Sequence, residues 1–382
     1  MKNNFFSALT GSVVLVVCAL CPIAWASDNG VTDSEIRIGQ FAAQTGPAAE
    51  LGKRVQAGIK AQFDAVNAAG GVSGRKLVLV SRDDGYEPEK AAAAAKALID
   101  DDKVFALIGS VGTSTTLAAL PAITAASIPL IGPVTGAQAL REPFNRNLFH
   151  VRASYFDETE RIVQHLTTLG ITKIAVFYQN DAFGKTGLEG VNRALQRRKL
   201  KTVGTMTVER NSVDVAASIS ELLRLAPEAV VQISAYTSSA ALIKQARAKS
   251  FSGQFFNVSF VGARALTEAL GDAGVGVTIS QVVPFPFASS SLISREYQQR
   301  MTESGDKDFD FSSMEGFLAA KVLTEGLRRA SKGLSRQSLT TALESMTDYN
   351  MGGFSVTYSP TDHEASNFIE LTIMGRGGKF VR

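Results

Sequence analysis

Apolar and polar positions follow two different spacings along this chain. Short apolar runs and stretches that alternate residue by residue are typical of strands, and apolar residues three or four positions apart are typical of helices. The predicted strands occupy 35–42, 76–80, 104–108, 128–131, 173–178, 203–208, 229–233, 255–258 and 278–283. The predicted helices occupy 51–66, 88–98, 113–120, 156–169, 187–197, 215–225 and 239–249. This order predicts an α/β fold with parallel sheets that carry helices on both faces.

The strand–helix pattern pauses after residue 136 and starts again near residue 156. With 382 residues, the chain is also long enough for about two domains. We therefore predict two similar doubly wound α/β lobes joined by short crossovers. The tail differs, because its pattern predicts two helices, 314–330 and 336–344, and an antiparallel pair of strands, 353–358 with 368–373.

The first 26 residues predict a signal peptide. A lysine is followed by a mostly apolar run, 13–23, and by Ala24-Trp25-Ala26, which places small residues where a signal peptidase cleaves. We therefore expect cleavage before Ser27 and export to the periplasm. The apolar run is short for a membrane span. Large residues precede Cys18 and Cys21, which argues against a lipid anchor.

Charge and motif content exclude several classes of function. The net charge is +3, from 39 basic and 36 acidic residues, which gives no sign of nucleic-acid binding. Both cysteines lie in the leader, so we expect neither a disulfide nor a thiolate metal site. His150, His165 and His363 lack metal-ligand spacing, and the motifs of nucleotide, zinc and serine hydrolases are absent from the sequence. We expect no enzyme, no cofactor and no metal.

One turn is suited to holding an anion. The apolar run Val104–Ile108 leads through the small residues Gly109–Gly112 into a helix that opens at Thr113. A helix N-terminus presents unpaired N–H groups and a partial positive charge, and open α/β sheets bind ligands at the carboxyl ends of their strands. An ordinary turn, in which Thr113 or Ser114 only caps the helix, accounts for the same residues.

Five stretches of the chain carry a resemblance to a known family: TGPAAELG (45–52), AAGGVSGRKLVLVSRDDGYEPEKA (68–91), ALIGSVGTSTTLAALPAITAASIPLIGPVTGA (106–137), YQNDAFGKTGLEG (178–190) and ALIKQARA (241–248). In this order they resemble the branched-chain amino acid type of periplasmic substrate-binding protein, which delivers its ligand to an ABC importer. The resemblance covers about residues 35–375. It implies the type I periplasmic binding fold, in which two α/β lobes joined by three hinge crossovers hold the ligand between them.

The resemblance also implies where the lobes begin and end. The first lobe would consist of residues 31–152 and 285–350, and the second lobe of residues 153–284 and 351–382. The three hinges would lie near Ala153, Val283–Phe285 and Met351–Gly353.

A ligand site between the lobes follows from the same resemblance. The ligand carboxylate would sit on two turns of the first lobe, at Thr113, Ser114, Val134, Thr135 and Gly136. The apolar part of the ligand would be covered by Phe183, Tyr236 and Leu51. Simple packing explains Phe183 and Leu51 equally well.

The sequence departs from the family where a ligand amine would bind. Amino acid binders of this family place an acidic residue after the strand that ends near Val258, but this chain has Ser259-Phe260-Val261-Gly262 there. A buried ammonium group without a counter-charge is costly, and Asp181 is the one candidate for that charge. The family's disulfide is also missing, with Tyr86 and Gly112 in its place. The predicted ligand is therefore a carboxylate that need not carry an amine, such as an aliphatic or aromatic acid, with branched-chain amino acids as the default.

These features favour a monomeric periplasmic protein that captures a small carboxylate or amino acid and hands it to the membrane subunits of an ABC permease. A periplasmic sensor that reports to a membrane receptor kinase would have the same soluble chain. A hydrolase on a flavodoxin-like core is a third class, but fold analogy alone does not place catalytic groups.

Overall fold

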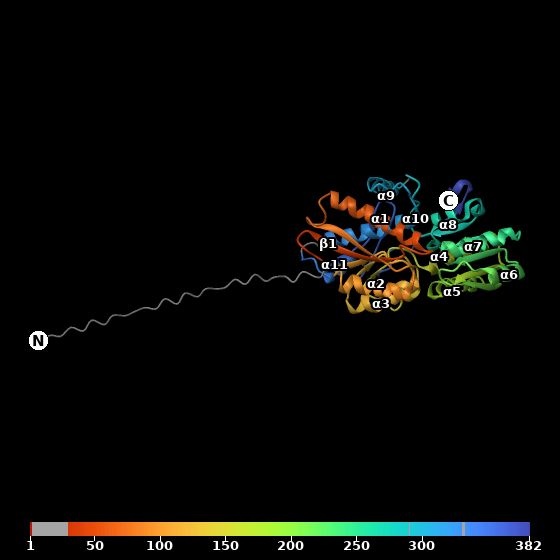
Figure 1. Ribbon diagram of the computed structural model, residues 1–382, viewed down its shortest axis with the longest axis horizontal. Helices are drawn as coiled ribbons and strands as arrows, with labels where there is room; N and C mark the ends of the chain where they lie inside the picture. Colours follow the sequence, from red (N-terminus) through yellow and green to blue (C-terminus); the bar gives the residue numbers. More distant parts are fainter. Residues whose placement is uncertain (2–29, 290, 331–332) are drawn as a thin grey trace.

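The computed structural model describes Met1 and residues 30–289, 291–330 and 333–382. The predicted signal peptide, apart from Met1, lies outside these residues. The described chain forms two α/β lobes side by side, each built on its own sheet (Figure 1). This confirms the predicted two-lobed α/β fold. Among the described helices, none is long and apolar enough to cross a membrane.

The first lobe is built on a five-stranded sheet with the order β2-β1-β3-β4-β5, and all of its pairings are parallel. Its strands are β1 (Glu35–Ala42), β2 (Lys76–Asp83), β3 (Ala106–Ile108), β4 (Leu130–Ile131) and β5 (Leu148–Phe149). Its helices are α1 (Ala49–Ala68), α2 (Pro88–Asp100), α3 (Thr113–Ala125), α9 (Leu292–Glu303), α10 (Phe311–Arg329) and α11 (Arg336–Glu344). The last three helices come from far along the chain, and α10 packs along α1.

The second lobe is built on a seven-stranded sheet with the order β14-β13-β10-β9-β8-β6-β7. Its parallel strands are β6 (Ile174–Gln179), β7 (Gly204–Val208), β8 (Ala229–Ile233), β9 (Gln254–Asn257) and β10 (Thr278–Gln281). Two antiparallel strands, β13 (Glu370–Met374) and β14 (Phe380–Val381), extend its edge. Its helices are α4 (Tyr155–Thr168), α5 (Ala182–Arg197), α6 (Ala216–Leu225), α7 (Tyr236–Ala248) and α8 (Ala263–Leu270).

The predicted antiparallel pair at the end of the chain is wrong. Strand β12 (Ser355–Val356) pairs with β11 (Tyr349–Asn350), whereas β13 pairs with β10. The parallel sheet of the second lobe offers an open edge at β10, and β13 fills that edge instead of folding back on its neighbour in sequence.

The chain passes between the two sheets in three places: after β5, after β10, and between Ala365 and β13. The expected hinges at Ala153 and Val283–Phe285 lie in the first two connections. In the third, the segment before Ala365 stays with the first sheet, because the His150 N–H donates to the His363 carbonyl and the Ala365 N–H to the His150 carbonyl. The lobe boundaries given above, with a third hinge near 351–353, stay a prediction.

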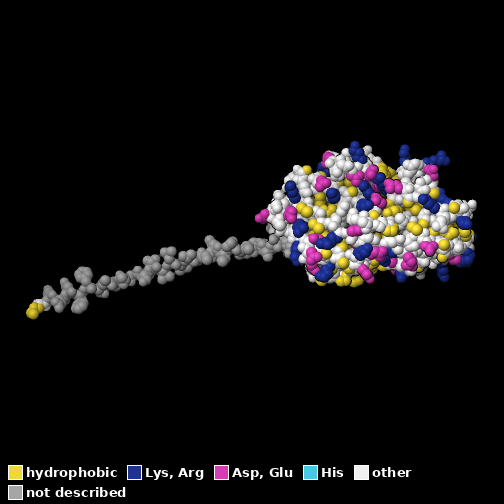
Figure 2. Space-filling view, viewed as in Figure 1, with side chains coloured by type: hydrophobic (Ala, Val, Ile, Leu, Met, Phe, Trp, Pro, Cys, Tyr) yellow, Lys and Arg dark blue, Asp and Glu magenta, His cyan; other side chains and the backbone are white. Residues whose placement is uncertain are grey.

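The surface carries both signs of charge. Figure 2 shows lysine and arginine side chains mixed with aspartate and glutamate over the visible face of both lobes. This mixing agrees with the small net charge, and the visible face carries no basic patch that would bind a polyanion such as a nucleic acid.

The contact between α1 and α10 depends on two glycines. A Cβ atom at Gly58 would lie 1.8 Å from the carbonyl oxygen of Ser313, and one at Gly316 would lie 2.1 Å from that of Val55. The two helix backbones therefore touch, and this contact fixes α10, which comes late in the chain, to the first lobe.

We predict that Gly58→Ala lowers the free energy of unfolding by about 3 kcal/mol, because the added methyl group forces the two helices apart. Alanine's higher helix propensity offsets only about 1 kcal/mol. Urea denaturation followed by circular dichroism measures the change. Lys60→Ala, at an exposed position of the same helix, is the control and should stay within about 0.5 kcal/mol of wild type. Equal stabilities for the two variants would contradict the close contact.

Candidate functional site

Two turns of the first lobe meet to form a polar corner between the lobes. Val111, in the turn after β3, forms a bridge with Val134, in the turn after β4. This pairing brings the buried Thr113 and Thr135 together, with 2.6 Å between their hydroxyl oxygens. The pair lies at the first turn of α3, so the positive end of that helix faces it. We call Thr113 and Thr135 the threonine corner.

The alternative account of this turn, in which Thr113 or Ser114 caps the helix, is wrong. The N-cap residue of α3 is Gly112, which has φ +104° and offers no side chain. The two hydroxyl groups are used in tertiary contacts instead: Thr113 bonds to Thr135, and Ser114 donates to the Asp181 carboxylate at 2.9 Å. The first turn of α3 is therefore left without a side-chain cap at the corner.

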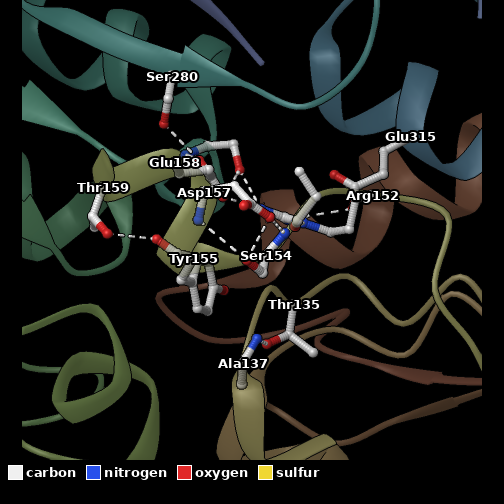
Figure 3. A network of polar contacts seen from close by, with 12 residues as sticks. Thr135, Ala137, Arg152, Ser154, Tyr155, Asp157, Glu158, Thr159, Ser280 and Glu315 are labelled. Carbon is white, nitrogen blue, oxygen red and sulfur yellow. Dashed lines mark hydrogen bonds and ion pairs between the residues drawn. The ribbon is translucent and has the colours of Figure 1, made fainter. Parts of the chain in front are cut away.

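Tyr155 brings the second lobe to this corner. It is the first residue of α4, and its N–H donates to the carbonyl oxygen of Gly136 at 2.8 Å. Figure 3 places its ring beside Thr135. Its hydroxyl oxygen is buried and makes no hydrogen bond of normal geometry among the described residues, although Thr135 and the Gly136 backbone lie close enough to lower its pKa in part. Burial raises the pKa of Tyr155 to about 12, so the hydroxyl stays neutral and can donate to a bound anion.

Aromatic rings continue from Tyr155 around the corner. The ring centroids lie 5.2 Å apart for Tyr155 and Phe183, 4.7 Å for Phe183 and Phe260, and 5.9 Å for Phe260 and Tyr86. A Cβ atom at Gly112 would lie 2.5 Å from the Tyr86 ring, so the wall of rings returns to the start of α3. All four rings are buried. They separate the corner from water.

Asp181 is already engaged by protein donors. One carboxylate oxygen accepts from the backbone N–H groups of Phe183 and Gly184 at the start of α5. The other accepts from Ser114 at 2.9 Å, from Gln179 at 2.7 Å and from Arg210 at 3.0 Å. The predicted start of α5 at residue 187 was therefore five residues late, because Asp181 caps a helix that begins at Ala182. Asp181 is poorly placed to pair with a ligand amine as well.

Leu51 and Tyr236 lie farther along the seam between the lobes. A Cβ atom at Gly262 would lie 2.5 Å from the Leu51 side chain. Leu51 therefore packs against Gly262 of the second lobe, which follows Phe260 by two residues. Tyr236 is half-buried at the start of α7. Burial raises the pKa of Tyr236, and a hydrogen bond from the Glu50 backbone opposes this rise. Both residues therefore join the lobes beside α1. The structure thus gathers Thr113, Ser114, Val134, Thr135, Gly136, Phe183 and Asp181 around the corner, with Leu51 and Tyr236 along the seam.

A buried arginine holds the base of the site. Arg152, in the first connection between the lobes, is 1% exposed and pairs with Glu158 of α4 and, at 3.3 Å, with Glu315 of α10 (Figure 3). Glu158 also accepts from the Ser259 backbone N–H at 2.7 Å and from the Ser280 hydroxyl at 2.5 Å. We call these five residues the Arg152 cluster. It ties α4, and with it Tyr155, to both lobes.

Sequence reasoning missed four residues of the site: Tyr86, Tyr155, Phe260 and Arg152. A local signal existed for Tyr155, because Ser154 and Asp157 form a capping box that fixes the start of α4 one residue before the predicted Phe156. Tyr86 and Phe260 make their ring contacts with segments far away in the sequence, and Arg152 pairs with the distant Glu315 as well as with the nearby Glu158, so no local pattern reveals their roles.

Asp84 lies next to Tyr86 and is buried in the first lobe. One of its carboxylate oxygens accepts from the Tyr86 backbone N–H at 2.8 Å, and the other has no partner among the residues described. Burial raises the pKa of Asp84 to about 7. The neighbouring Asp83 accepts from Gln44 and Thr45, and these hydrogen bonds outweigh burial and lower its pKa to about 2.

Comparison with known proteins places this arrangement among solute binders. A family described as periplasmic binding protein matches residues 35–378. An amino acid binding protein of Pseudomonas aeruginosa is 27% identical over 228 residues, or 59% of this chain and 60% of that protein. The Leu/Ile/Val-binding protein homolog 7 of Brucella abortus is 24% identical over 349 residues, or 86% of this chain and 85% of that protein. A crystal structure of a possible leucine/isoleucine/valine-binding protein from Rhodopirellula baltica SH 1 has a TM-score of 0.86 at 33% identity, covering 91% of this chain and 96% of that one.

We predict that Arg152→Gln lowers the free energy of unfolding by about 4 kcal/mol, because it leaves two buried carboxylates without a cation. Urea denaturation measures this loss. Arg224→Gln, which breaks an exposed ion pair with Glu221 on α6, is the control and should cost less than about 1 kcal/mol. A loss of similar size in both variants would contradict a structural role for the Arg152 cluster.

We predict that Asp84→Asn flattens the pH dependence of stability between pH 4 and pH 7. A carboxyl group whose pKa is raised on folding stabilises the folded state below its unfolded pKa and loses that contribution as pH rises through its folded pKa, about 7 here. Wild type should therefore lose about 3 kcal/mol relative to the variant across this range. Urea denaturation at several pH values measures the difference.

Asp83→Asn is the matched control. Because its pKa is lowered on folding, its stabilising contribution is complete above pH 4 and is lost only as pH falls toward 2. The difference in the free energy of unfolding between Asp83→Asn and wild type should therefore stay constant between pH 4 and pH 7. If the difference for Asp84→Asn is also constant over this range, the pKa of Asp84 is not raised.

Proposed function

The chain belongs to the periplasmic binding protein family, and from this premise we propose that it captures a small carboxylate without an amine between its lobes and delivers it to an ABC permease. The predicted resemblance to Leu/Ile/Val-binding proteins is confirmed. The family consists of periplasmic solute-binding proteins rather than enzymes, so the expectation of a non-enzyme is confirmed as well. The ligand class and the permease partner are the proposed part.

The threonine corner is the observation that carries the proposal. Two buried threonine hydroxyl groups, the buried hydroxyl of Tyr155 and the uncapped start of α3 meet at one place. A carboxylate accepts hydrogen bonds from hydroxyl and N–H donors, and charge-assisted bonds of this kind are shorter and stronger than neutral ones. A carboxylate at the corner would replace the bond that Thr113 and Thr135 now make with each other.

The surroundings of the corner argue against a bound ammonium group. Phe260, in the stretch where amino acid binders of the family have an acid, packs against Phe183 and Tyr86. Asp181, the predicted alternative, already accepts five hydrogen bonds. An ammonium group buried here would lack a counter-charge, whereas an apolar chain or ring would gain contact with aromatic surface.

Lobe separation and closure would couple binding to transport. The aromatic rings that enclose the corner come from both lobes, so a ligand that contacts them favours the closed form. The closed form is then the state that a membrane partner can distinguish from the open one.

Matched pairs of ligands test the missing amine. We predict that 4-methylpentanoate binds more tightly than leucine, and 3-phenylpropanoate more tightly than phenylalanine, by at least about tenfold, because only the amino acids carry an ammonium group. Thermal-shift screening followed by isothermal titration measures each pair. Tight binding of leucine with no binding of 4-methylpentanoate would disprove the amine-free ligand. Failure of all four compounds and of other small carboxylates would disprove the carboxylate site.

Substitution at the corner tests the anion site itself. We predict that Thr113→Val weakens binding of the tightest acid by about 10- to 100-fold, because a charge-assisted hydrogen bond contributes about 1.5–3 kcal/mol. Thr115→Val on the same helix is the control, since the Thr115 hydroxyl donates to the Val111 carbonyl, and its affinity should change less than about threefold. Equal losses for both variants would contradict a carboxylate at Thr113.

A further inference from the structure

A second set of contacts joins the lobes outside the threonine corner. From the second lobe, Asp181 follows β6 and Arg210 follows β7, and from the first lobe, Glu87 precedes α2 and Ser114 lies in α3. The Arg210 guanidinium lies between the two carboxylates, 3.0 Å from Asp181 and 3.4 Å from Glu87. We call Ser114, Asp181, Arg210 and Glu87 the clasp.

Hydrogen bonds from two amide side chains also join the lobes beside the clasp. The Asn211 side chain donates to Glu87 at 2.7 Å and to the Gly85 carbonyl at 3.3 Å. The Gln179 amide donates to the Tyr86 hydroxyl at 3.2 Å. Each of these bonds connects the second lobe to the turn after β2 in the first lobe, so they are made only when the lobes are closed.

The charges of the clasp have a consequence for closure. Closing the lobes brings Glu87 and Asp181 to opposite sides of one guanidinium group. Two carboxylates that come this close repel each other unless a cation lies between them. Arg210 supplies that cation from the same lobe as Asp181. Water screens this repulsion only in part, because the Arg210 and Asp181 side chains are 19% and 8% exposed, although that of Glu87 is 42% exposed.

We infer that Arg210 is a positioning residue that determines how far the ligand-free protein closes, by converting a repulsion between Asp181 and Glu87 into a bridge. It acts through Asp181, which caps α5 and thereby orients Phe183 over the threonine corner. Arg210 thus affects the ligand site without touching a ligand. The inference rests on the proposed lobe motion and not on the identity of the ligand.

Distance measurement between the lobes in the absence of any ligand tests this inference. Spin labels at Lys60→Cys on α1 and Lys249→Cys after α7 report the separation of the lobes, in the full chain with Cys18→Ser and Cys21→Ser. Both labelled positions are exposed. We expect Arg210→Gln to increase the ratio of open to closed molecules about three- to fivefold, the range of a partly exposed ion pair.

A second substitution distinguishes charge from packing. Adding Glu87→Gln to Arg210→Gln removes the like charge, so the double variant should close again toward the wild-type ratio. Arg224→Gln, which breaks an exposed pair with Glu221 on α6, is the control and should leave the ratio unchanged. Thermal unfolding of each variant verifies that it is folded. An unchanged ratio in Arg210→Gln, or an open double variant, would overturn the inference, whereas ligand titrations alone decide the proposed function.

Discussion

The buried pairing of Arg152 with Glu158 and Glu315 is the constraint on which the rest of this structure depends. A charge removed from water must keep its partners, and the partners of Arg152 belong to helices of different lobes. Burial favours the neutral form of Glu315 and raises its pKa, while the Arg152 charge opposes that shift. The connection between the lobes is therefore fixed at its base, and the start of α4, which carries Tyr155, is fixed with it.

The Arg152 cluster and the clasp both join the two lobes, but they differ in how strongly water competes for their charged groups. In the Arg152 cluster every charged side chain is less than 10% exposed, whereas Glu87 of the clasp is 42% exposed. Exposed pairs contribute little and are easily replaced by water, and buried pairs are not. Motion that opens the clasp while the cluster stays paired is therefore the least costly way for the lobes to separate, and it opens the seam over the threonine corner.

Local sequence signals predicted most of the fold, because a period of two or 3.6 residues reports directly which residues face a core. Strand β1 and helix α11 have the predicted bounds, and α2 begins at Pro88 as expected. The pairing of β13 with β10 was not predictable, since the two strands are about 90 residues apart and no turn joins them. The site follows the same division. Thr113 and Thr135 follow adjacent strands and could be expected to meet. The pairing of Arg152 with Glu315 and the ring contacts of Phe260, in contrast, depend on distant segments.

Two departures from the family pattern have a common physical explanation. Tyr86 and Gly112 stand where relatives are expected to have a disulfide, and the Tyr86 ring packs against the backbone of Gly112 so closely that a side chain there would overlap it. Phe260 stands near the place of the expected acid and packs against the same ring. Where the resemblance implies a covalent bridge and a charge, this chain thus has aromatic surface, and both places lie beside the threonine corner. If a carboxylate binds at the threonine corner as proposed, the rest of the ligand would meet apolar surface, which suits a carboxylic acid better than a zwitterion.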